Sequence, residues 1–453
     1  MGTHNLMTET FLALTVSMVT VLDGVLRGFS TIALPHLELT ENEGSWFAAL
    51  AFTCGILLTP LGGFIAGFLG RKKTLMVISP FVSIGWLFIA SSNSKSMLFL
   101  GRILTSVATY SMLATPNAYI AETVHPDVRA TLASIPGFAM SVGLSTIWIL
   151  GYFLDWRTIA YLASSLPLVL VLFLVYLPES PYWLIEHNQD ELAEKSLQFF
   201  RSHDVIEEIN EIHLRKLEKS KSQEESLTLI SRNLLSMTFW KPFSCIGIIW
   251  SLNMLSGFPA LTNYLIPLME ESGSELDPSL APMIIGILRL LIAFGVPFIV
   301  QKMHPRTSFV IGQALKAISM GIIGTYFAIH NHYPESTIFS WLPMVMIIFQ
   351  FFIRSVTILP VLYTLVGELF PTEVRALGVG LVQSSYFASA ALIVKLYPDL
   401  KSLMGLNGLL YFYMGIGIFN SIWGYWTIPD NRSKSLIEVE GMYDNTTTPL
   451  IQK

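Results

Sequence analysis

The sequence predicts an all-α polytopic membrane protein whose twelve transmembrane helices form two pseudo-symmetric six-helix bundles. The first supporting observation is composition: 52% of the 453 residues are hydrophobic and only 13% are charged, whereas a soluble domain carries about 25% charged residues. The second is the regular return of apolar runs, each about 20 residues long and able to cross roughly 30 Å of hydrocarbon as a helix. The third is a charged motif that occurs twice.

The apolar runs are interpreted as helices because none alternates over about 10 residues, as the strands of a membrane β-barrel would. The longest polar stretch, residues 179–240, falls between the sixth and seventh runs and divides the chain into six plus six. The twelve predicted spans are residues 10–33, 46–69, 74–92, 98–121, 130–153, 158–178, 241–268, 280–301, 307–329, 338–366, 376–397 and 403–428.

The charged motif indicates that the two halves follow one plan. Its first copy, AETVHPDVRATL, contains Glu122 and Arg129, and its second, GELFPTEVRALG, contains Glu368 and Arg375. In both copies the glutamate follows an apolar run and stands seven positions before the arginine, and the copies lie 246 residues apart. Repetition at this distance is the sequence signature of an internal structural repeat.

Two further features occur once in each half. A basic loop follows the second span (GRKK, 70–73) and the eighth span (QKMHPR, 301–306). A proline–acid pair ends the sixth span (PESPYWL, 178–184) and the twelfth (PDNRSKSL, 429–436). Because these features recur in the same order, they predict a parallel repeat, which is typical of carriers that rock two bundles about a central site.

The charge pattern predicts the domains and their orientation. Lys and Arg gather on the side that holds the 179–240 loop, whereas the opposite loops are acidic, so both termini are predicted to be cytoplasmic. The N-terminus reads as a retained first span rather than a signal peptide, and a multi-pass protein of the plasma membrane is expected. The predicted parts are an N-terminal bundle (1–178), a loop with short amphipathic helices (179–240), a C-terminal bundle (241–428) and a tail (429–453).

Four stretches, taken together, are specific enough to suggest a family. They are GGFIAGFLGRKK, GRILTSVATYSMLATPNAYIAETVHPDVRATL, PESPYWL and PDNRSKSL. They resemble the motifs of the sugar porters of the major facilitator superfamily, in particular facilitative glucose transporters and insect facilitated trehalose transporters. The match extends from about Ser45 to Glu440. The resemblance implies the major facilitator fold and alternating-access transport of a small polar solute, a hexose or trehalose, as facilitated uniport or coupled to an ion.

The sequence departs from this family where the family binds sugar. The family's seventh-span QQxSGIN aligns with NMLSGFP at residues 253–259, and its fifth-span glutamine aligns with Gly137. The eighth-span asparagine aligns with Arg289, and the tenth-span GPxPW aligns with LPVLY, which ends at Tyr363. Tyr264 matches the family's tyrosine at the outer gate. The expected substrate contacts are Asn253, Ser256, Tyr264, Arg289, Tyr363 and Tyr386.

The duplicated charges suggest a gate. Ion pairs between the two halves would hold the inner mouth shut and would break when it opens, which places charge at a bistable interface. The alternative is that these residues only anchor helix ends at the membrane surface. The expected gating charges are Arg71, Glu122, Arg129, Glu179, Arg306, Glu368 and Arg375.

Ionisable residues inside apolar spans are costly and are functional by default. Asp23 and Arg27 stand at i and i+4 of the first span, so they share a helix face and either pair with each other or couple to a proton or substrate. Lys316, Arg354 and Lys395 are expected to reach toward the membrane surface or to face loops.

Two functions besides sugar transport stay open on the sequence. Arg289, and the absence of most of the Gln and Asn side chains with which the family binds sugar, favour a carrier of an anionic or other non-sugar organic solute. The same scaffold could also serve a non-transporting receptor. An enzyme is not expected, because the sequence has no zinc-spaced histidines, no GxSxG and no P-loop lysine. We expect no metal, no cofactor and no nucleic-acid partner. The expected partners are a small solute and the lipid bilayer, and the protein is expected to be a monomer.

Overall fold

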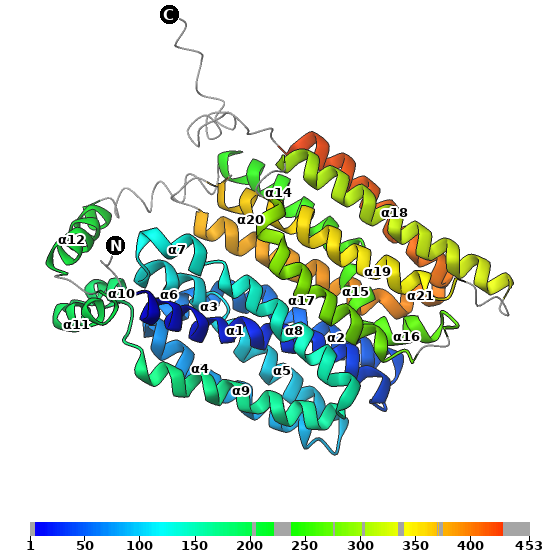
Figure 1. Ribbon diagram of the computed structural model, residues 1–453, viewed down its shortest axis with the longest axis horizontal. Helices are drawn as coiled ribbons and strands as arrows, with labels where there is room; N and C mark the ends of the chain where they lie inside the picture. The colour runs from blue at the N-terminus through cyan, green and yellow to red at the C-terminus, as the bar shows by residue number, and fades with distance from the viewer. Residues whose placement is uncertain are drawn as a thin grey trace, which may run out of the picture. The chain divides into compact units, whose positions relative to one another are not determined.

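In the computed structural model the chain divides into two compact units, Met1–Glu224 and Glu225–Lys453, and each is described by itself. Most of the described chain is α-helical (Figure 1). The division falls inside the polar stretch 179–240; the domain boundaries given above stay predictions. The structure describes residues 5–201, 205–221, 237–274, 277–300, 304–333, 339–368, 370 and 375–428.

The first unit is built from helices that follow the first six predicted spans, with three more helices after them. Its elements are α1 (Leu6–Ala33), the 3₁₀ turn η1 (Leu34–His36), α2 (Glu41–Thr53), α3 (Gly55–Leu69), α4 (Arg71–Ala90), α5 (Lys95–Met112), α6 (Thr115–Thr123), α7 (Pro126–Leu132), α8 (Ile135–Phe153), α9 (Trp156–Tyr176), α10 (Pro181–Glu186), α11 (Asp190–Phe200) and α12 (Ile206–Lys221).

Polar side chains begin several of these helices and satisfy N–H groups that have no partner within the helix. Before α2, the Thr40 hydroxyl accepts from the Glu43 N–H and the Glu43 carboxylate accepts from the Thr40 N–H, a reciprocal capping box. The side chains of Ser94 and Asp155 cap α5 and α9, each by accepting one hydrogen bond from a backbone N–H of the first turn, without the reciprocal bond. The loops between spans therefore supply the stop and start signals of the bundle.

Helices α1 and α8 approach so closely that backbone meets backbone. A Cβ added to Gly24 would lie 2.2 Å from the Met140 carbonyl oxygen, and one added to Gly143 would lie 2.2 Å from the Val21 carbonyl oxygen. Small residues at such crossings permit the close packing that holds membrane helices together. This contact fixes α1 against α8 at the centre of the N-terminal unit.

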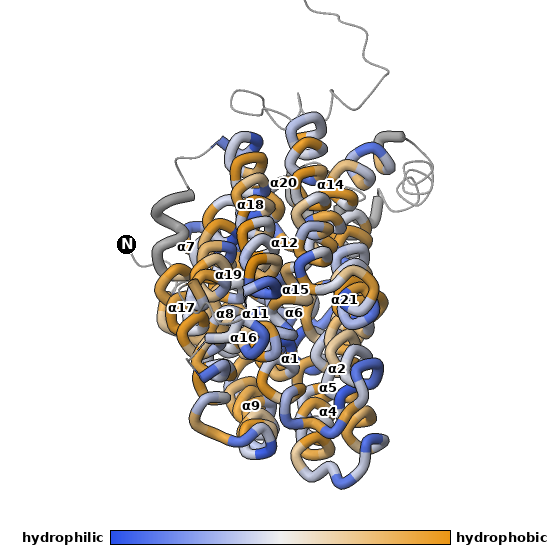
Figure 2. Tube along the Cα trace, turned by 90° about the vertical axis from the view of Figure 1, so that its right-hand side faces the viewer, coloured by the Kyte–Doolittle hydropathy of each residue, from blue (hydrophilic) through white to orange (hydrophobic). Residues whose placement is uncertain are grey.

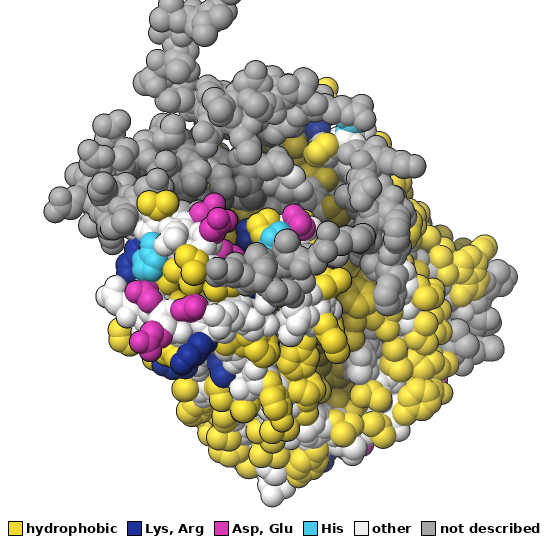
Figure 3. Space-filling view, turned by 60° about the vertical axis from the view of Figure 1, so that its left-hand side comes forward, with side chains coloured by type: hydrophobic (Ala, Val, Ile, Leu, Met, Phe, Trp, Pro, Cys, Tyr) yellow, Lys and Arg dark blue, Asp and Glu magenta, His cyan; other side chains and the backbone are white. Residues whose placement is uncertain are grey.

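The polar stretch after the sixth span forms a small folded layer of its own. Helices α10, α11 and α12 enclose an apolar cluster that includes Trp183, Leu197 and Ile212. In Figure 3 the charged side chains gather toward this end of the unit, while the flank over the N-terminal helices is largely yellow. The predicted amphipathic helices thus bury their apolar faces against one another.

The second unit repeats the plan with more interruptions. The last of its helices is 53 residues long and is broken at Gly405, whose φ of 70° is left-handed. Its elements are α14 (Met237–Leu255), α15 (Phe258–Asn263), α16 (Leu265–Glu270), α17 (Leu280–Val300), α18 (Pro305–His332), α19 (Leu342–Ile353), the π-helical turn η2 (Arg354–Ile358), α20 (Leu359–Glu368) and α21 (Arg375–Thr427).

The apolar helices match the predicted crossings. Among the described residues, ten helical stretches are long and apolar enough to span a membrane, and one of them, Leu377–Thr427, is 51 residues long. The break at Gly405 divides that stretch into two crossings, and 280–293 adds a shorter apolar helix, which makes twelve. Figure 2 shows the corresponding pattern, with hydrophobic helices joined by hydrophilic turns.

Candidate functional site

The seventh predicted span contains a helix break. α14 ends at Leu255 and α15 begins at Phe258, and Gly257 between them has φ of 88°. Only glycine adopts this left-handed conformation without strain, and the ring of Tyr413 lies against it, 2.2 Å from where a Cβ would stand. The break leaves carbonyl groups at the end of α14 without helical donors. Broken helices of this kind form the binding sites of many transporters.

Lys316 of α18 supplies donors to this broken end. Its side chain is 0% exposed, and its Nζ lies 3.0 Å from the Asn253 carbonyl oxygen, 3.0 Å from Asn253 Oδ1 and 2.7 Å from Ser256 Oγ. All three N–H donors of the ammonium group are therefore used. The prediction that Lys316 reaches the membrane surface or a loop is wrong, because the broken helix offers it acceptors inside the unit.

The Asn253 amide is held at one end and unpartnered at the other. Its Oδ1 accepts from Lys316 and also from Gln313 Nε2, at 3.1 Å. Its Nδ2 is buried and has no hydrogen-bond partner among the residues that the structure describes. A buried donor without a partner costs about 1–3 kcal/mol, so this atom is a candidate for a ligand contact.

An aromatic cluster lies one helical turn before Asn253. The indole of Trp250 contacts Tyr363 of α20 at a ring-centroid distance of 5.5 Å and Tyr386 of α21 at 5.3 Å, both edge to face. Trp250 Nε1 is buried and, within the described part of the chain, has no hydrogen-bond partner. Trp250 and Asn253 are three positions apart, so their two donors lie on neighbouring turns of one face of α14.

Two arginines pack on a pair of phenylalanines beside the break. Arg289 lies over Phe351 with Cζ 5.6 Å from the ring centroid, and Arg354 lies over Phe258 at 4.3 Å. The two phenylalanines are themselves in edge-to-face contact at 4.8 Å. The Lys316 ammonium is 5.9 Å from the Phe258 ring. Cation–π contacts of this kind stabilise a desolvated cation by about 2 kcal/mol.

Tyr264 lies beyond the break, between α15 and α16. Its ring stacks on that of Tyr397 of α21, with centroids 4.3 Å apart and an interplanar angle of 14°. This contact links the broken span to α21 without joining the polar groups of Asn253 and Ser256.

A hollow of the second unit lies elsewhere. It has a volume of about 540 Å³ and is lined mainly by apolar and aromatic residues of α18 and α21, such as Ile322, Tyr326 and Tyr411. None of the expected substrate contacts lines it. Its lining suits an acyl chain better than a polar solute, and for that reason it is not the candidate site.

The first copy of the charged motif forms an ion pair inside the N-terminal unit. Arg71 Nη2 lies 2.5 Å from Glu122 Oε1, and the other carboxylate oxygen of Glu122 accepts from Ser180 Oγ at 2.5 Å. Glu179 caps the start of α4, accepting from the N–H groups of Arg71 at 2.8 Å and Lys72 at 3.0 Å. The three expected gating charges Arg71, Glu122 and Glu179 thus meet in one cluster.

The other expected gating charges are distributed differently. Arg129 donates from Nε and Nη2 to the Val124 carbonyl oxygen, at 3.1 and 2.9 Å. Arg306, in the second unit, lies over the ring of Tyr425 at 4.3 Å. The side chains of Glu368 and Arg375 lie outside the described residues.

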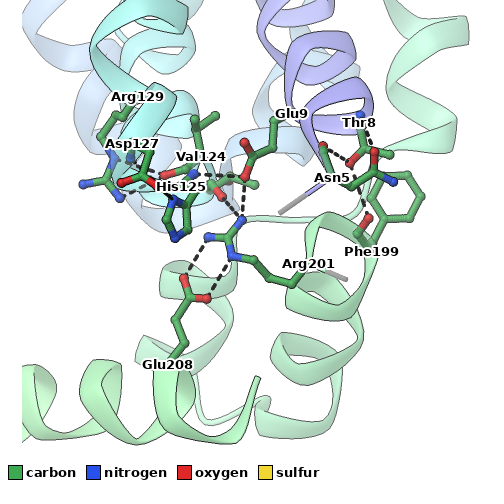
Figure 4. A network of polar contacts seen from close by, with 11 residues as sticks. Asn5, Thr8, Glu9, Val124, His125, Asp127, Arg129, Phe199, Arg201 and Glu208 are labelled. Carbon is green, nitrogen blue, oxygen red and sulfur yellow. Dashed lines mark hydrogen bonds and ion pairs between the residues drawn. The ribbon is translucent and has the colours of Figure 1, made fainter. Parts of the chain in front are cut away.

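A second buried network joins the N-terminal unit to its outer helices (Figure 4). Glu9 of α1 and Arg201, at the end of α11, form an ion pair of 2.7 Å with side chains 0% and 1% exposed. Arg201 also holds both carboxylate oxygens of Glu208 on α12, at 2.8 and 2.9 Å. Glu9 accepts in addition from the His125 N–H at 3.0 Å. The Arg201 guanidinium group and its partner Glu9 therefore join four parts of the unit: α1, α11, α12 and the connection between α6 and α7.

Two charges inside the spans of the first unit are satisfied locally. Arg27 Nε lies 2.7 Å from Asp23 Oδ1, so the two residues pair with each other on α1. Arg102, which is completely buried, donates to two backbone carbonyl groups and to Ser30 Oγ. Neither arrangement requires a ligand.

The profile of the family described as "Sugar (and other) transporter" matches residues 33–443, most of the chain. The chain belongs to the sugar transporter family. It is therefore a multi-pass membrane protein, and its family is one of transporters rather than enzymes. The resemblance inferred from the motifs is confirmed.

Curated relatives of this sugar transporter family carry matching names. The facilitated trehalose transporter Tret1 of Anopheles gambiae is 25% identical over 444 residues, 96% of this chain and 56% of the relative. The protein of the same name from Culex quinquefasciatus is 24% identical over 439 residues, 94% of this chain and 84% of the relative. The chain thus spans about half the length of the first relative and most of the second.

Solved structures confirm the fold. The xylose transporter XylE of E. coli in an inward-open conformation aligns with a TM-score of 0.74 and 18% identity, over 95% of this chain and 99% of XylE. XylE described as a proton:xylose symporter bound to 6-bromo-6-deoxy-D-glucose aligns with a TM-score of 0.73 and 19% identity, over 96% and 99%. The predicted twelve-helix major facilitator fold is confirmed.

In the structure, four of the six expected substrate contacts fall into two pairs, and each pair is joined by a further residue. Lys316 joins Asn253 and Ser256, and Trp250 joins Tyr363 and Tyr386. Neither linking residue was among the predicted contacts. A lysine inside an apolar span was the available signal for Lys316. For Trp250 the available signal was its position inside the seventh predicted span, away from the span ends where tryptophans act as anchors.

Proposed function

We propose that this protein carries a neutral sugar, a hexose or trehalose, across a membrane by alternating access, as facilitated uniport or with a coupling ion. Support comes from the family and from relatives named as trehalose transporters and a xylose transporter. The same comparisons do not favour a carrier of non-sugar anions or a non-transporting receptor.

The observation that carries this proposal is the pair of unpartnered donors on α14 beside an aromatic cluster. Sugars present hydroxyl groups at their edges and C–H groups on their faces. Small-molecule sites combine aromatic walls with a few placed polar groups, and Trp250, Asn253, Tyr363 and Tyr386 supply both kinds of contact. We assign Ser256, Tyr264 and Arg289 supporting contacts: Ser256 holds Lys316, while Tyr264 and Arg289 flank the break.

The direct test is uptake of radiolabelled trehalose, D-glucose and D-xylose by purified protein in liposomes. Saturable uptake of at least one sugar, competed by the unlabelled sugar and absent from empty liposomes, is the expected result. Collapse of a proton gradient separates uniport, which is unaffected, from proton coupling, which is slowed. Saturable uptake of an organic anion such as citrate, with no uptake of any sugar, would overturn the proposal.

We also propose that the charged motifs gate the inner mouth, as the Arg71–Glu122–Glu179 cluster suggests for the first copy. By repetition, Glu368 and Arg375 do the same for the second copy. The Glu368→Gln variant is expected to favour an inward-open state. Raised reactivity of cysteines introduced at the inner mouth measures that shift, and unchanged reactivity together with normal flux would refute the gating role.

The location of the protein is a proposal as well. The Lys and Arg distribution supports cytoplasmic termini, and we place a monomer in the plasma membrane. A cysteine at position 222, in the basic loop, should react with an impermeant reagent only after the cells are permeabilised. Labelling of intact cells would reverse the orientation, and crosslinking of two copies in the membrane would contradict the monomer.

A further inference from the structure

Lys316 is a buried cation whose hydrogen-bond acceptors are all neutral, as are those of Arg102 in the first unit. Its ammonium group donates to a carbonyl oxygen, an amide oxygen and a hydroxyl oxygen, all on the last turn of α14 and the residue after it. With three N–H groups and three acceptors, it has no donor left for a ligand. Lys316 therefore acts on a substrate only through the residues that it holds.

The residue that Lys316 holds most completely is Asn253. An ammonium group donates and never accepts, so the Asn253 atom that faces it must be the amide oxygen. Gln313 Nε2 donates to the same oxygen at 3.1 Å. The amide cannot rotate by half a turn without placing its NH₂ group against the Lys316 ammonium, and the orientation of Asn253 is thereby set by Lys316.

This orientation decides what Asn253 offers. Its Nδ2 is buried, and no described residue accepts a hydrogen bond from it. Trp250 Nε1, one turn earlier on α14, is likewise buried and has no hydrogen-bond partner among the described residues. Both atoms are donors, so the two positions together present N–H groups and no acceptor.

We propose that Lys316 is the positioning residue that sets substrate specificity at α14. By locking the Asn253 oxygen it makes the site recognise a substrate oxygen that accepts hydrogen bonds. This inference rests on the proposed function, because it assumes that a sugar occupies the face of α14 that carries Trp250 and Asn253. Beyond the proposed function, this inference states that the site donates hydrogen bonds to the substrate and that Lys316 is the residue responsible.

The decisive variant is Asn253→Asp. It replaces Nδ2 by an oxygen of nearly the same size and keeps the oxygen to which Lys316 donates, with an opposite charge beside the ammonium group. The fold is therefore expected to survive, with an unchanged or raised Tm. The KM for the transported sugar is expected to rise at least about tenfold, because the substrate acceptor loses its donor.

The second variant, Lys316→Met, keeps an unbranched side chain that is only one atom shorter and removes its donors. Only Gln313 Nε2 then holds the Asn253 oxygen, so the amide turns more readily and we expect KM to rise with a smaller change in kcat. The matched control is Lys395→Met. Lys395 is a lysine of the second unit that lies 3.8 Å from Asp399 on α21 and is not part of the site, and its loss should leave KM unchanged.

The experiment measures KM, kcat and Tm for the wild type and the three variants in liposomes, with D-glucose and trehalose as probes. Deoxy and fluoro analogues of D-glucose add a readout that a structural role would not move. Fluorine can accept a hydrogen bond and hydrogen cannot, so the wild type should prefer a fluoro analogue over the matching deoxy analogue at one ring position. Asn253→Asp should abolish that preference.

Each outcome decides the question. No uptake of either probe by the wild type would overturn the proposed function and this inference with it. Uptake by the wild type with a KM of Asn253→Asp within twofold would overturn the inference alone. So would a misfolded Asn253→Asp, because the variant keeps the acceptor for Lys316. An unchanged KM in Lys316→Met would show that Lys316 only stabilises the fold.

Discussion

The two units follow one plan, but they differ in how buried cations are satisfied. Arg102 of the N-terminal unit is held by neutral oxygens, whereas three other arginines of that unit are paired with carboxylates. In the N-terminal unit, Arg71, Arg201 and Arg27 each lie within 2.5–2.7 Å of a carboxylate oxygen. In the C-terminal unit, Lys316 is held by three neutral oxygens. Asn253 and Trp250 beside it keep donors that no described residue uses.

The difference indicates that the buried polar groups of the two units serve different purposes. An ion pair between buried groups is self-sufficient, and loss of either partner leaves an uncompensated charge. A cation held by the carbonyl end of a broken helix instead interacts favourably with the helix dipole and leaves nearby amides available. The N-terminal unit thus uses its buried charges for internal cohesion, and the C-terminal unit keeps hydrogen-bonding capacity for a ligand, as we propose.

The largest effect is expected from Arg201→Met. The variant leaves Glu9 buried without its cation, and such a loss typically costs about 3–5 kcal/mol of stability. Thermal or denaturant unfolding in detergent would measure it. The matched control is Lys95→Met, which breaks the exposed Lys95–Glu43 pair, whose side chains are 52% and 34% exposed, and should cost less than about 1 kcal/mol. Equal losses in the two variants would mean that burial adds nothing to the contribution of the Glu9–Arg201 pair, and the claim that buried ion pairs hold the N-terminal unit together would fail.

A smaller effect is expected from Glu122→Gln. The pair with Arg71 is partly exposed, at 19% and 13%, and glutamine still accepts a hydrogen bond, so we expect a loss of about 1–2 kcal/mol. A double-mutant cycle with Arg71→Met measures the coupling between the two residues. If the single variants prove additive, the ion pair contributes nothing and the start of α4 is held by the capping contacts of Glu179 instead.

The smallest effect is expected from Trp250→Phe. Phenylalanine keeps the ring contacts with Tyr363 and Tyr386 and removes only the Nε1–H donor. One net hydrogen bond of about 0.5–1.5 kcal/mol corresponds to a rise in sugar KM of roughly twofold to tenfold. Trp426→Phe is the control, since Trp426 is 79% exposed and should leave KM unchanged. A Trp250→Phe variant with wild-type KM would mean that this donor does not face the substrate.

The sequence alone determined the number and position of the spans, the duplication and the family. These properties are local or additive: a span needs a certain length of apolar residues, and a repeated motif can be found without knowing which residues it touches. The pairing of Asp23 with Arg27 was also predictable, because a helix fixes the distance between i and i+4.

Only the tertiary structure decided which polar groups are satisfied. Lys316 and Asn253 are 63 positions apart, and nothing local tells a lysine in an apolar span whether it will reach the membrane surface or a neighbouring helix. The outcome depends on the break at Gly257, which frees acceptors on α14, and on the packing of α18 against that break. Glu9 and Arg201 meet across 192 positions for the same reason: burial of a charge is stable only where packing delivers a partner.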